Sequence, residues 1–241
     1  MEEPKKARKI SVDNEGLGCC LMIGLVVGAL LLGNAIRASR ADDRVVSVKG
    51  LCEREVKADK VICPFAYKEG GDNLQQLYRT IEDKNGVIIE FLKDAGISEE
   101  EITIAAPKVV DTRTEWSGSQ NRYAYIVTSV VTVCTDKVDE IIALQSRQGE
   151  LLQRGIATAA SWEYQTVYSF TKLNEIKPAM IETATKNARE TAEKFADDSD
   201  SKLGKIKRAT QGQFSITDRD SNTPYMKNVR VVTSVDYYLK D

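Results

Sequence analysis

The sequence predicts an α+β fold with mainly antiparallel sheets and long helices packed on them, preceded by one N-terminal transmembrane helix. Three observations predict this fold. An uncharged run lies near the N-terminus, segments with alternating apolar residues occur in pairs after it, and helix-spaced segments separate the pairs irregularly. A doubly wound nucleotide-binding fold would need regular strand–helix alternation, which this order lacks.

Residues 17–36 contain no charged residue, and Asn34 is their only strongly polar one. At about 1.5 Å rise per residue, a helix of this length spans the ~30 Å hydrocarbon core of a bilayer. We expect residues 1–16 to form a cytoplasmic head and residues 17–36 an uncleaved signal anchor that enters the membrane. Residues 37–44 then form a charged linker, and residues 45–241 form the exported domain, as one body or two subdomains.

The orientation of the anchor is not set by charge, because basic residues flank the uncharged run on both sides. A single anchor near the N-terminus most often exports the domain on its C-terminal side, so we expect the head inside and the domain outside. Gly24 and Gly28 form a small-xxx-small pair that would let two anchors approach each other. The alternative is that glycine is simply frequent in membrane helices.

The exported domain opens with two expected strands, over residues 45–56 and 60–67, paired as a hairpin around residues 57–59. In that register Cys52 lies opposite Cys63, and a Cα separation of about 4.5–5.5 Å permits a disulfide. The alternative is that both are small apolar core residues. Cys134 then has no partner within the domain, and we expect it to be buried.

A long helix is expected to begin after Asp72 or Asn73 and to end at Gly96, with apolar residues spaced by three and four. The pair Asn85–Gly86 inside it marks either a break or a close packing point. Residues 102–115 and 123–135 are expected as strands, with Pro107 making part of the first an edge or a bulge, and a helix begins after Asp136.

Residues 162–170 read as the clearest strand, because aromatic residues alternate along it. The residues that share its aromatic face are Trp162, Tyr164, Tyr168 and Phe170. This face is either part of the core, covered by helices, or a contact or ligand face.

A last helix is expected from Asn174, and one side of it is apolar and consists mostly of alanine. This side contains Ile181, Ala184, Ala188, Ala192, Phe195 and Ala196. Because alanine leaves little side chain, the helix should lie close to a sheet. Residues 205–216 and 228–239 form the closing strand pair.

The chain contains no histidine, which excludes Ser-His-Asp and Cys-His catalytic groups. The net charge of −2 argues against nucleic-acid binding, for which a basic surface is expected. We therefore predict no enzyme, no catalytic residue, no cofactor and no metal site.

Four segments together resemble the SIMPL-domain (YggE-like) family, over residues 45–241. They are VVSVKGLCEREVKADKVI, KPAMIETATKNARETAEKFA, KLGKIKRA and VRVVTSVDYYL. The resemblance implies an α+β fold, a bacterial envelope location with the domain on the periplasmic side of the inner membrane, and a ring-like oligomer in at least one member. It also implies a link to oxidative-stress defence, and it carries over no catalytic residue.

The sequence supports three functional hypotheses. The first is a non-enzymatic, self-assembling envelope protein held in the membrane by residues 17–36. The second is a small-molecule or lipid-binding module that uses the aromatic face of residues 162–170. The third is a thiol-based peroxide scavenger that uses Cys52 and Cys63.

Overall fold

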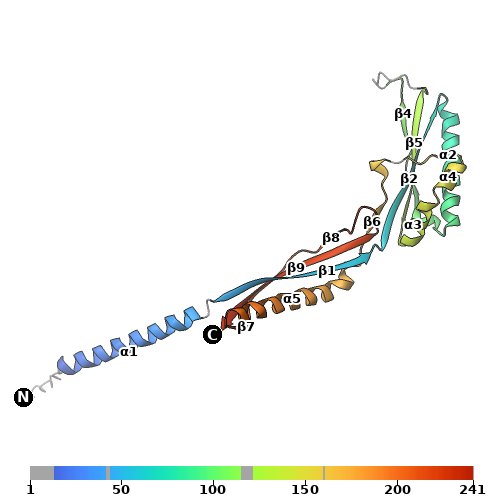
Figure 1. Cartoon of the computed structure of the whole chain (residues 1–241). Helices are drawn as coiled ribbons and strands as arrows, with labels where there is room; N and C mark the ends of the chain where they lie inside the picture. The colour runs from blue at the N-terminus through green and yellow to red at the C-terminus, as the bar shows by residue number, and fades with distance from the viewer. Residues whose placement is uncertain (1–13, 42–43, 115–121, 160, 241) are drawn as a thin grey trace, which may run out of the picture. The chain divides into compact units, whose positions relative to one another are not determined.

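The structure is a computed structural model that describes residues 14–41, 44–114, 122–159 and 161–240, with the side chains of residues 21–36 in the first helix. This helix, α1 (Asn14–Ala41), contains the whole uncharged run (Figure 1). Within the described residues, no helix combines the length and the apolar composition of a membrane span. The transmembrane helix predicted for residues 17–36 is thus not found there.

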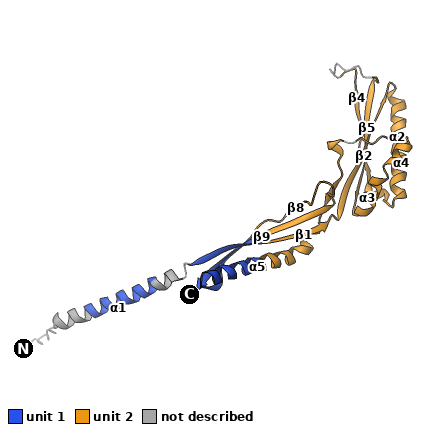
Figure 2. Cartoon of the chain, in the orientation of Figure 1, with its two compact units in different colours: residues 1–50, 185–211, 233–241 blue, residues 51–184, 212–232 orange. Residues whose placement is uncertain are grey.

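The chain divides into two compact units (Figure 2). Unit 1 comprises residues 1–50, 185–211 and 233–241, and unit 2 comprises residues 51–184 and 212–232. Three elements contribute residues to both units: β1 (Val45–Lys57), α5 (Leu173–Asp198) and β9 (Met226–Lys240).

Two sheets are present in the described part of the chain. The first has the order β1-β9-β7, with β8 also paired to β9, and both β7 (Lys202–Gln211) and β8 (Ser215–Asp218) run antiparallel to β9. The second lies in unit 2 and has the order β3-β5-β2-β6, with β4 also paired to β5. Its antiparallel strands are β2 (Lys60–Gly71), β3 (Ile102–Ile104), β4 (Lys108–Asp111), β5 (Tyr125–Thr135) and β6 (Val167–Ser169). The predicted α+β class with antiparallel sheets is confirmed.

The predicted hairpin of residues 45–67 is wrong, because β1 and β2 belong to different sheets. The corner between them is held by distant residues instead of by its own turn. The Ala58 N–H donates to the Tyr225 carbonyl at 2.8 Å, and the Asp59 carboxylate accepts from the N–H groups of Thr171 and Lys172 at 2.7 and 2.9 Å. The chain therefore leaves one sheet and enters the other at this corner.

Helix α2 (Leu74–Asp94) forms as predicted. Asn73 caps it, since its side-chain oxygen accepts from the N–H groups of Gln75 and Gln76. The helix ends before Gly96, whose φ of +85° is favourable only for glycine. No break occurs at Asn85, which is buried instead.

Four short helical elements of unit 2 accompany this sheet: η1 (Glu99–Glu101), α3 (Val138–Ser146), α4 (Gly149–Gln153) and η2 (Trp162–Tyr164). The Glu101 carboxylate accepts from both the N–H and the hydroxyl of Ser98 at 2.8 Å. The predicted strand of residues 102–115 is split into β3 and β4 on either side of Pro107, as expected for a proline at a sheet edge.

The alanine side of α5 packs closely on the first sheet, as predicted. In unit 2, Ala184 contacts a cluster with Val229 and Val231, and in unit 1, Ala188 and Ala192 contact Val235 and Tyr237. These alanines are fully buried. Phe195 departs from the prediction, because its side chain is exposed.

Candidate functional site

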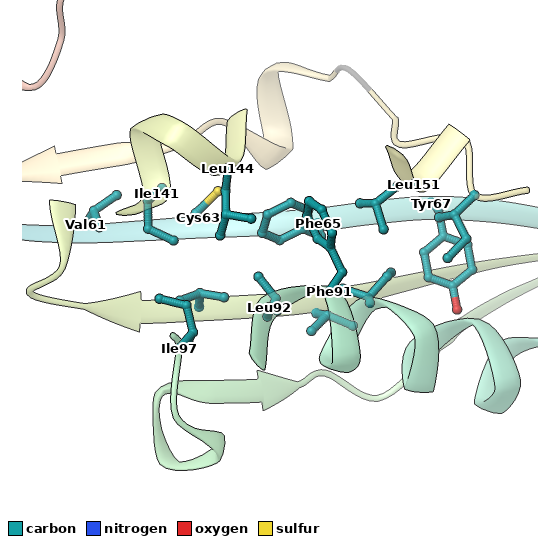
Figure 3. Packing of buried hydrophobic residues seen from close by; sticks show 14 of the residues in the cluster. Val61, Cys63, Phe65, Tyr67, Phe91, Leu92, Ile97, Ile141, Leu144 and Leu151 are labelled. Atoms are coloured by element: carbon teal, nitrogen blue, oxygen red, sulfur yellow. The ribbon is translucent and has the colours of Figure 1, made fainter. Parts of the chain in front are cut away.

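One face of the second sheet is buried beneath α2, α3 and α4 (Figure 3). Alternate residues of β2 point into this core, because side chains alternate along a strand. They are Val61, Cys63, Phe65 and Tyr67, which meet Phe91 and Leu92 from α2 and Ile141 and Leu144 from α3. This packing fixes β2 and β5 as a rigid platform.

Cys63 lies inside this core and is a poor candidate for thiol chemistry. Its sulfur is 3.4 Å from the Thr166 hydroxyl, which accepts from the Gln145 amide at 2.9 Å. Burial raises the pKa of the Cys63 thiol, although the Thr166 contact opposes this. Since the thiolate is the reactive form, this environment suppresses reaction with peroxide.

The disulfide predicted between Cys52 and Cys63 loses its basis, because the two strands do not pair. Both cysteines are free. Cys52 packs against the cluster under α5, whereas Cys63 belongs to the core of the second sheet. Cys134 is also free, and it is exposed where burial was expected.

The single aromatic strand predicted over residues 162–170 is wrong. Residues 162–164 form a 3-10 turn, η2 (Trp162–Tyr164), and only β6 is extended. Trp162 is 83% exposed, Tyr168 is buried in the core of the second sheet, and Phe170 packs in the cluster under α5. Tyr164 is half-buried, so the four rings do not form one face.

Tyr168 is held by polar contacts as well as by packing. Its hydroxyl donates to the side-chain amide oxygen of Gln145 at 3.2 Å, and its ring meets the Tyr225 ring edge-on with 6.1 Å between ring centres. Burial raises the pKa of Tyr168 to about 12. The residue therefore stays neutral and structural.

The opposite face of the second sheet carries an apolar row that lies outside the core. Ile62 pairs with Cys134 on β5 and with Val167 on β6, so the three side chains share one face. Ile62 is 42% exposed, Val167 is 55% exposed, and Cys134 is exposed. We call these three residues the outer row.

The outer row is the candidate functional site, because a rigid sheet presents it and no described element covers it. Association would remove these exposed apolar side chains from water, which favours contact at this row. Sequence reasoning missed the row, although one signal for it was present. Ile62 is a large apolar residue between the inward-facing Val61 and Cys63, which places it on the outer face.

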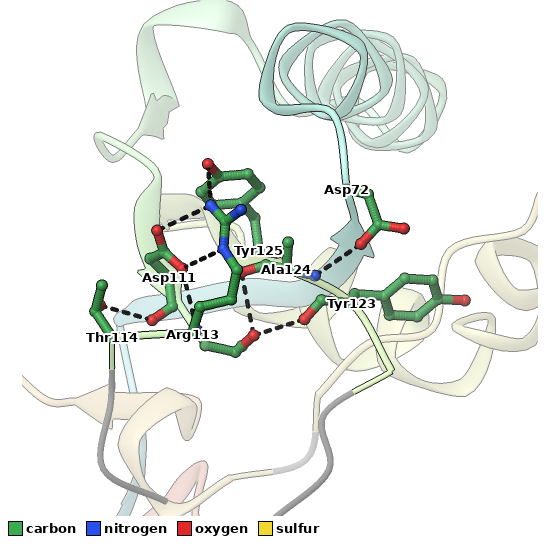
Figure 4. Close-up of polar contacts among 8 residues, drawn as sticks. Asp72, Asp111, Arg113, Thr114, Tyr123, Ala124 and Tyr125 are labelled. Atoms are coloured by element: carbon green, nitrogen blue, oxygen red, sulfur yellow. Dashed lines mark hydrogen bonds and ion pairs between the residues drawn. The ribbon is translucent and has the colours of Figure 1, made fainter.

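A separate polar cluster fixes the end of the β4–β5 hairpin (Figure 4). The Arg113 guanidinium donates to both carboxylate oxygens of Asp111 at 3.1 Å, contacts the Tyr125 hydroxyl, and lies 4.7 Å from the centre of the Tyr125 ring. These hydrogen bonds lower the pKa of Asp111. Asp72 adds a contact from the end of β2, since its carboxylate accepts from the Ala124 N–H at 2.8 Å. All groups are satisfied by one another, so the cluster is structural.

Gly24 and Gly28, the predicted anchor contact, lie in α1 with open space around them. A Cβ built at either glycine meets no other atom within 4 Å. The anchor dimer stays a prediction. Within the residues described, no group of three or more potential metal ligands occurs.

Comparison with known proteins adds one match. The family described as "SIMPL: Protein of unknown function (DUF541)" matches residues 46–236, which spans both units. No curated protein matches the chain.

Proposed function

Since the chain belongs to the SIMPL family, whose function is unknown, we propose that it is a non-enzymatic envelope protein that is anchored in the inner membrane and assembles with copies of itself. The outer row is the observation that carries this proposal. Burying Ile62 and Val167 against a second copy would remove their apolar surface from water, which favours association.

Anchoring is supported by the uncharged run of residues 17–36 and by the helical conformation of α1 around it. The described apolar side chains of this helix are exposed all round, including Leu21, Leu25, Leu30 and Leu32. A helix that is apolar on every side needs an apolar environment. Alkaline carbonate washing of cell membranes tests the anchor: the protein should stay in the pellet, and its full release would contradict anchoring.

The absence of enzymatic activity is proposed on chemical grounds. The chain contains no histidine, and the thiol of Cys63 is buried with a raised pKa. A link to oxidative-stress defence, which the resemblance implies, would then act through assembly and not through direct peroxide reduction. A peroxide-consumption assay on the purified protein tests this, and steady turnover would contradict it.

Self-assembly is tested first in intact membranes. Treatment with an amine-reactive cross-linker should give bands at multiples of the 26.8 kDa chain. The variant Ile62→Asp places a charge in the proposed contact and should reduce these bands. Leu152→Asp is the matched control, because Leu152 is similarly exposed on α4, outside the outer row. Equal cross-linking of wild type and Ile62→Asp would exclude the outer row as the contact.

A further inference from the structure

A groove of about 290 Å³ lies between α2 and the edge of the second sheet, on the helix-covered side. Apolar residues form most of its lining: Tyr78, Ile81, Ile89, Ile104 and Pro107. Glu82 also lines it and makes no ion pair with any described residue. The groove is thus apolar with one free carboxylate.

The buried side chain of Asn85, which is 7% exposed, lines the same groove with one unused hydrogen-bonding group. Its amide oxygen accepts from the hydroxyls of Tyr67 at 2.9 Å and Ser129 at 3.0 Å. Its amide nitrogen has no partner among the described residues. Among the described residues, the Thr233 hydroxyl is the only fully buried polar side-chain atom that has no hydrogen-bond partner. The Asn85 nitrogen therefore reaches open space, and that space is the groove.

The sheet edge beside the groove offers unpaired backbone groups. Ala105 N–H donates to the Val130 carbonyl, and Thr103 pairs with Thr132, so these residues hold β3 to β5. In an antiparallel pair, the residue between two residues that hydrogen-bond to the neighbouring strand points its N–H and C=O away from that strand. That residue is Ile104, so its backbone groups face the open edge.

The side chain of Ile104 lies on the groove side of the sheet. Ile104 is opposite Val131, a core residue under the helices, and it remains 47% exposed. The open backbone edge and the apolar groove therefore lie next to each other.

We propose that this groove binds an extended peptide segment of a partner protein, which adds a strand at Ile104 and inserts an apolar side chain beside Asn85. Strand addition uses the edge's main-chain groups for affinity and a side-chain pocket for specificity. The Asn85 amide nitrogen donates to a carbonyl of the segment. The free Glu82 carboxylate selects a segment with a lysine or arginine next to the apolar residue.

A random octapeptide library displayed on phage and selected on the full-length protein in detergent tests the proposal. The enriched peptides should share an apolar residue with a neighbouring basic residue. The leading peptide is then synthesised with a fluorescent label, and its Kd is measured by fluorescence polarisation.

Two variants address different parts of the site. Gly86→Leu fills the groove, because Gly86 lines it and a Cβ there meets nothing within 4 Å. Ile104→Pro removes the edge N–H, which an edge strand tolerates. Each should weaken binding at least about tenfold. Gly149→Leu makes the same change at another open helical glycine outside the groove, and it should leave the Kd unchanged.

Circular dichroism shows which variants fold, and either folded variant suffices for the test. Failure to enrich any peptide overturns the proposal, as does undiminished binding by any variant that folds. Light scattering tests whether a second copy of the chain occupies the groove instead. If no peptide binds and Gly86→Leu lowers the oligomer mass, a second copy fills the groove and the proposal is wrong. Self-assembly through the outer row is tested separately and does not depend on this result.

Discussion

Replacing Gly204 by alanine should destabilise unit 1, because β7 approaches β9 too closely at this point for any side chain. A Cβ at Gly204 would lie 2.6 Å from the Tyr238 carbonyl oxygen and 3.1 Å from the Tyr238 Cβ. Favourable contacts between carbon atoms lie at about 3.5–4.0 Å, so the alanine must push the strands apart. The pairing of β7 with β9 is already irregular here, with register shifts on both sides of Ile206.

The size of the stability change in Gly204→Ala depends on two opposing effects. Forcing an extra methyl into a packed site costs about 1–3 kcal/mol. Replacing glycine restricts the unfolded chain and returns about 0.4–1 kcal/mol. The midpoints of these two ranges leave a net loss of about 1.3 kcal/mol in the free energy of unfolding.

Urea denaturation followed by circular dichroism measures this loss as a lower midpoint. Gly86→Ala is the matched control, since the same substitution meets open space inside α2. It should raise stability by about 0.5–1 kcal/mol, because alanine favours a helix more than glycine does. A Gly204→Ala protein as stable as wild type would refute the close approach of the two strands.

Three further predictions concern pH, thiol reactivity and packing. Hydrogen bonds from Thr135, the Ser98 N–H and Lys137 lower the pKa of Glu101 to about 2. Because an unfolded glutamate titrates near pH 4.3, this carboxylate's contribution, about 1 kcal/mol after solvent screening, is present above that pH and is lost as pH falls to about 2. Glu101→Gln should flatten the acid limb of a stability–pH curve, and unchanged curvature would contradict this. Cys63 should resist iodoacetamide until the protein unfolds, as peptide mapping by mass spectrometry would show; rapid labelling of the native protein would contradict its burial. Ala192→Leu should cost about 1–3 kcal/mol by overpacking under α5, and an unchanged urea midpoint would argue against the close helix–sheet contact.

The elements of the fold could be predicted from local patterns, but the pairing of the strands could not. The alternating apolar residues predicted strands over residues 45–56 and 60–67, and both form, as β1 and β2. The alternation did not predict the strands with which β1 and β2 pair, because a period of two contains no information about the neighbouring strand in a sheet. The sequence of the turn already argued against a hairpin, because Lys57-Ala58-Asp59 has no glycine or asparagine for a tight hairpin turn. In the structure, Ala58 is also buried.

The candidate site was predictable only in part, for a related reason. Aromatic residues from Trp162 to Phe170 alternate in sequence, yet Ser161 accepts from the Glu163 N–H and starts a 3-10 turn that rotates the rings apart. The buried role of Asn85 depends on hydroxyls from β2 and β5, which are distant in sequence. The alanine ladder of α5 was predictable, because its spacing alone places the alanines on one side.

The folded body is proposed to associate through the outer row. Sedimentation equilibrium of the full-length protein in a density-matched detergent tests it most directly, with wild type beside the double variant Ile62→Asp/Val167→Asp, which places two like charges in the contact. We predict a wild-type mass that is a multiple of 26.8 kDa and a double variant that falls to one chain. A wild-type protein that stays a single chain at high concentration, or a double variant with the wild-type mass, would contradict the account.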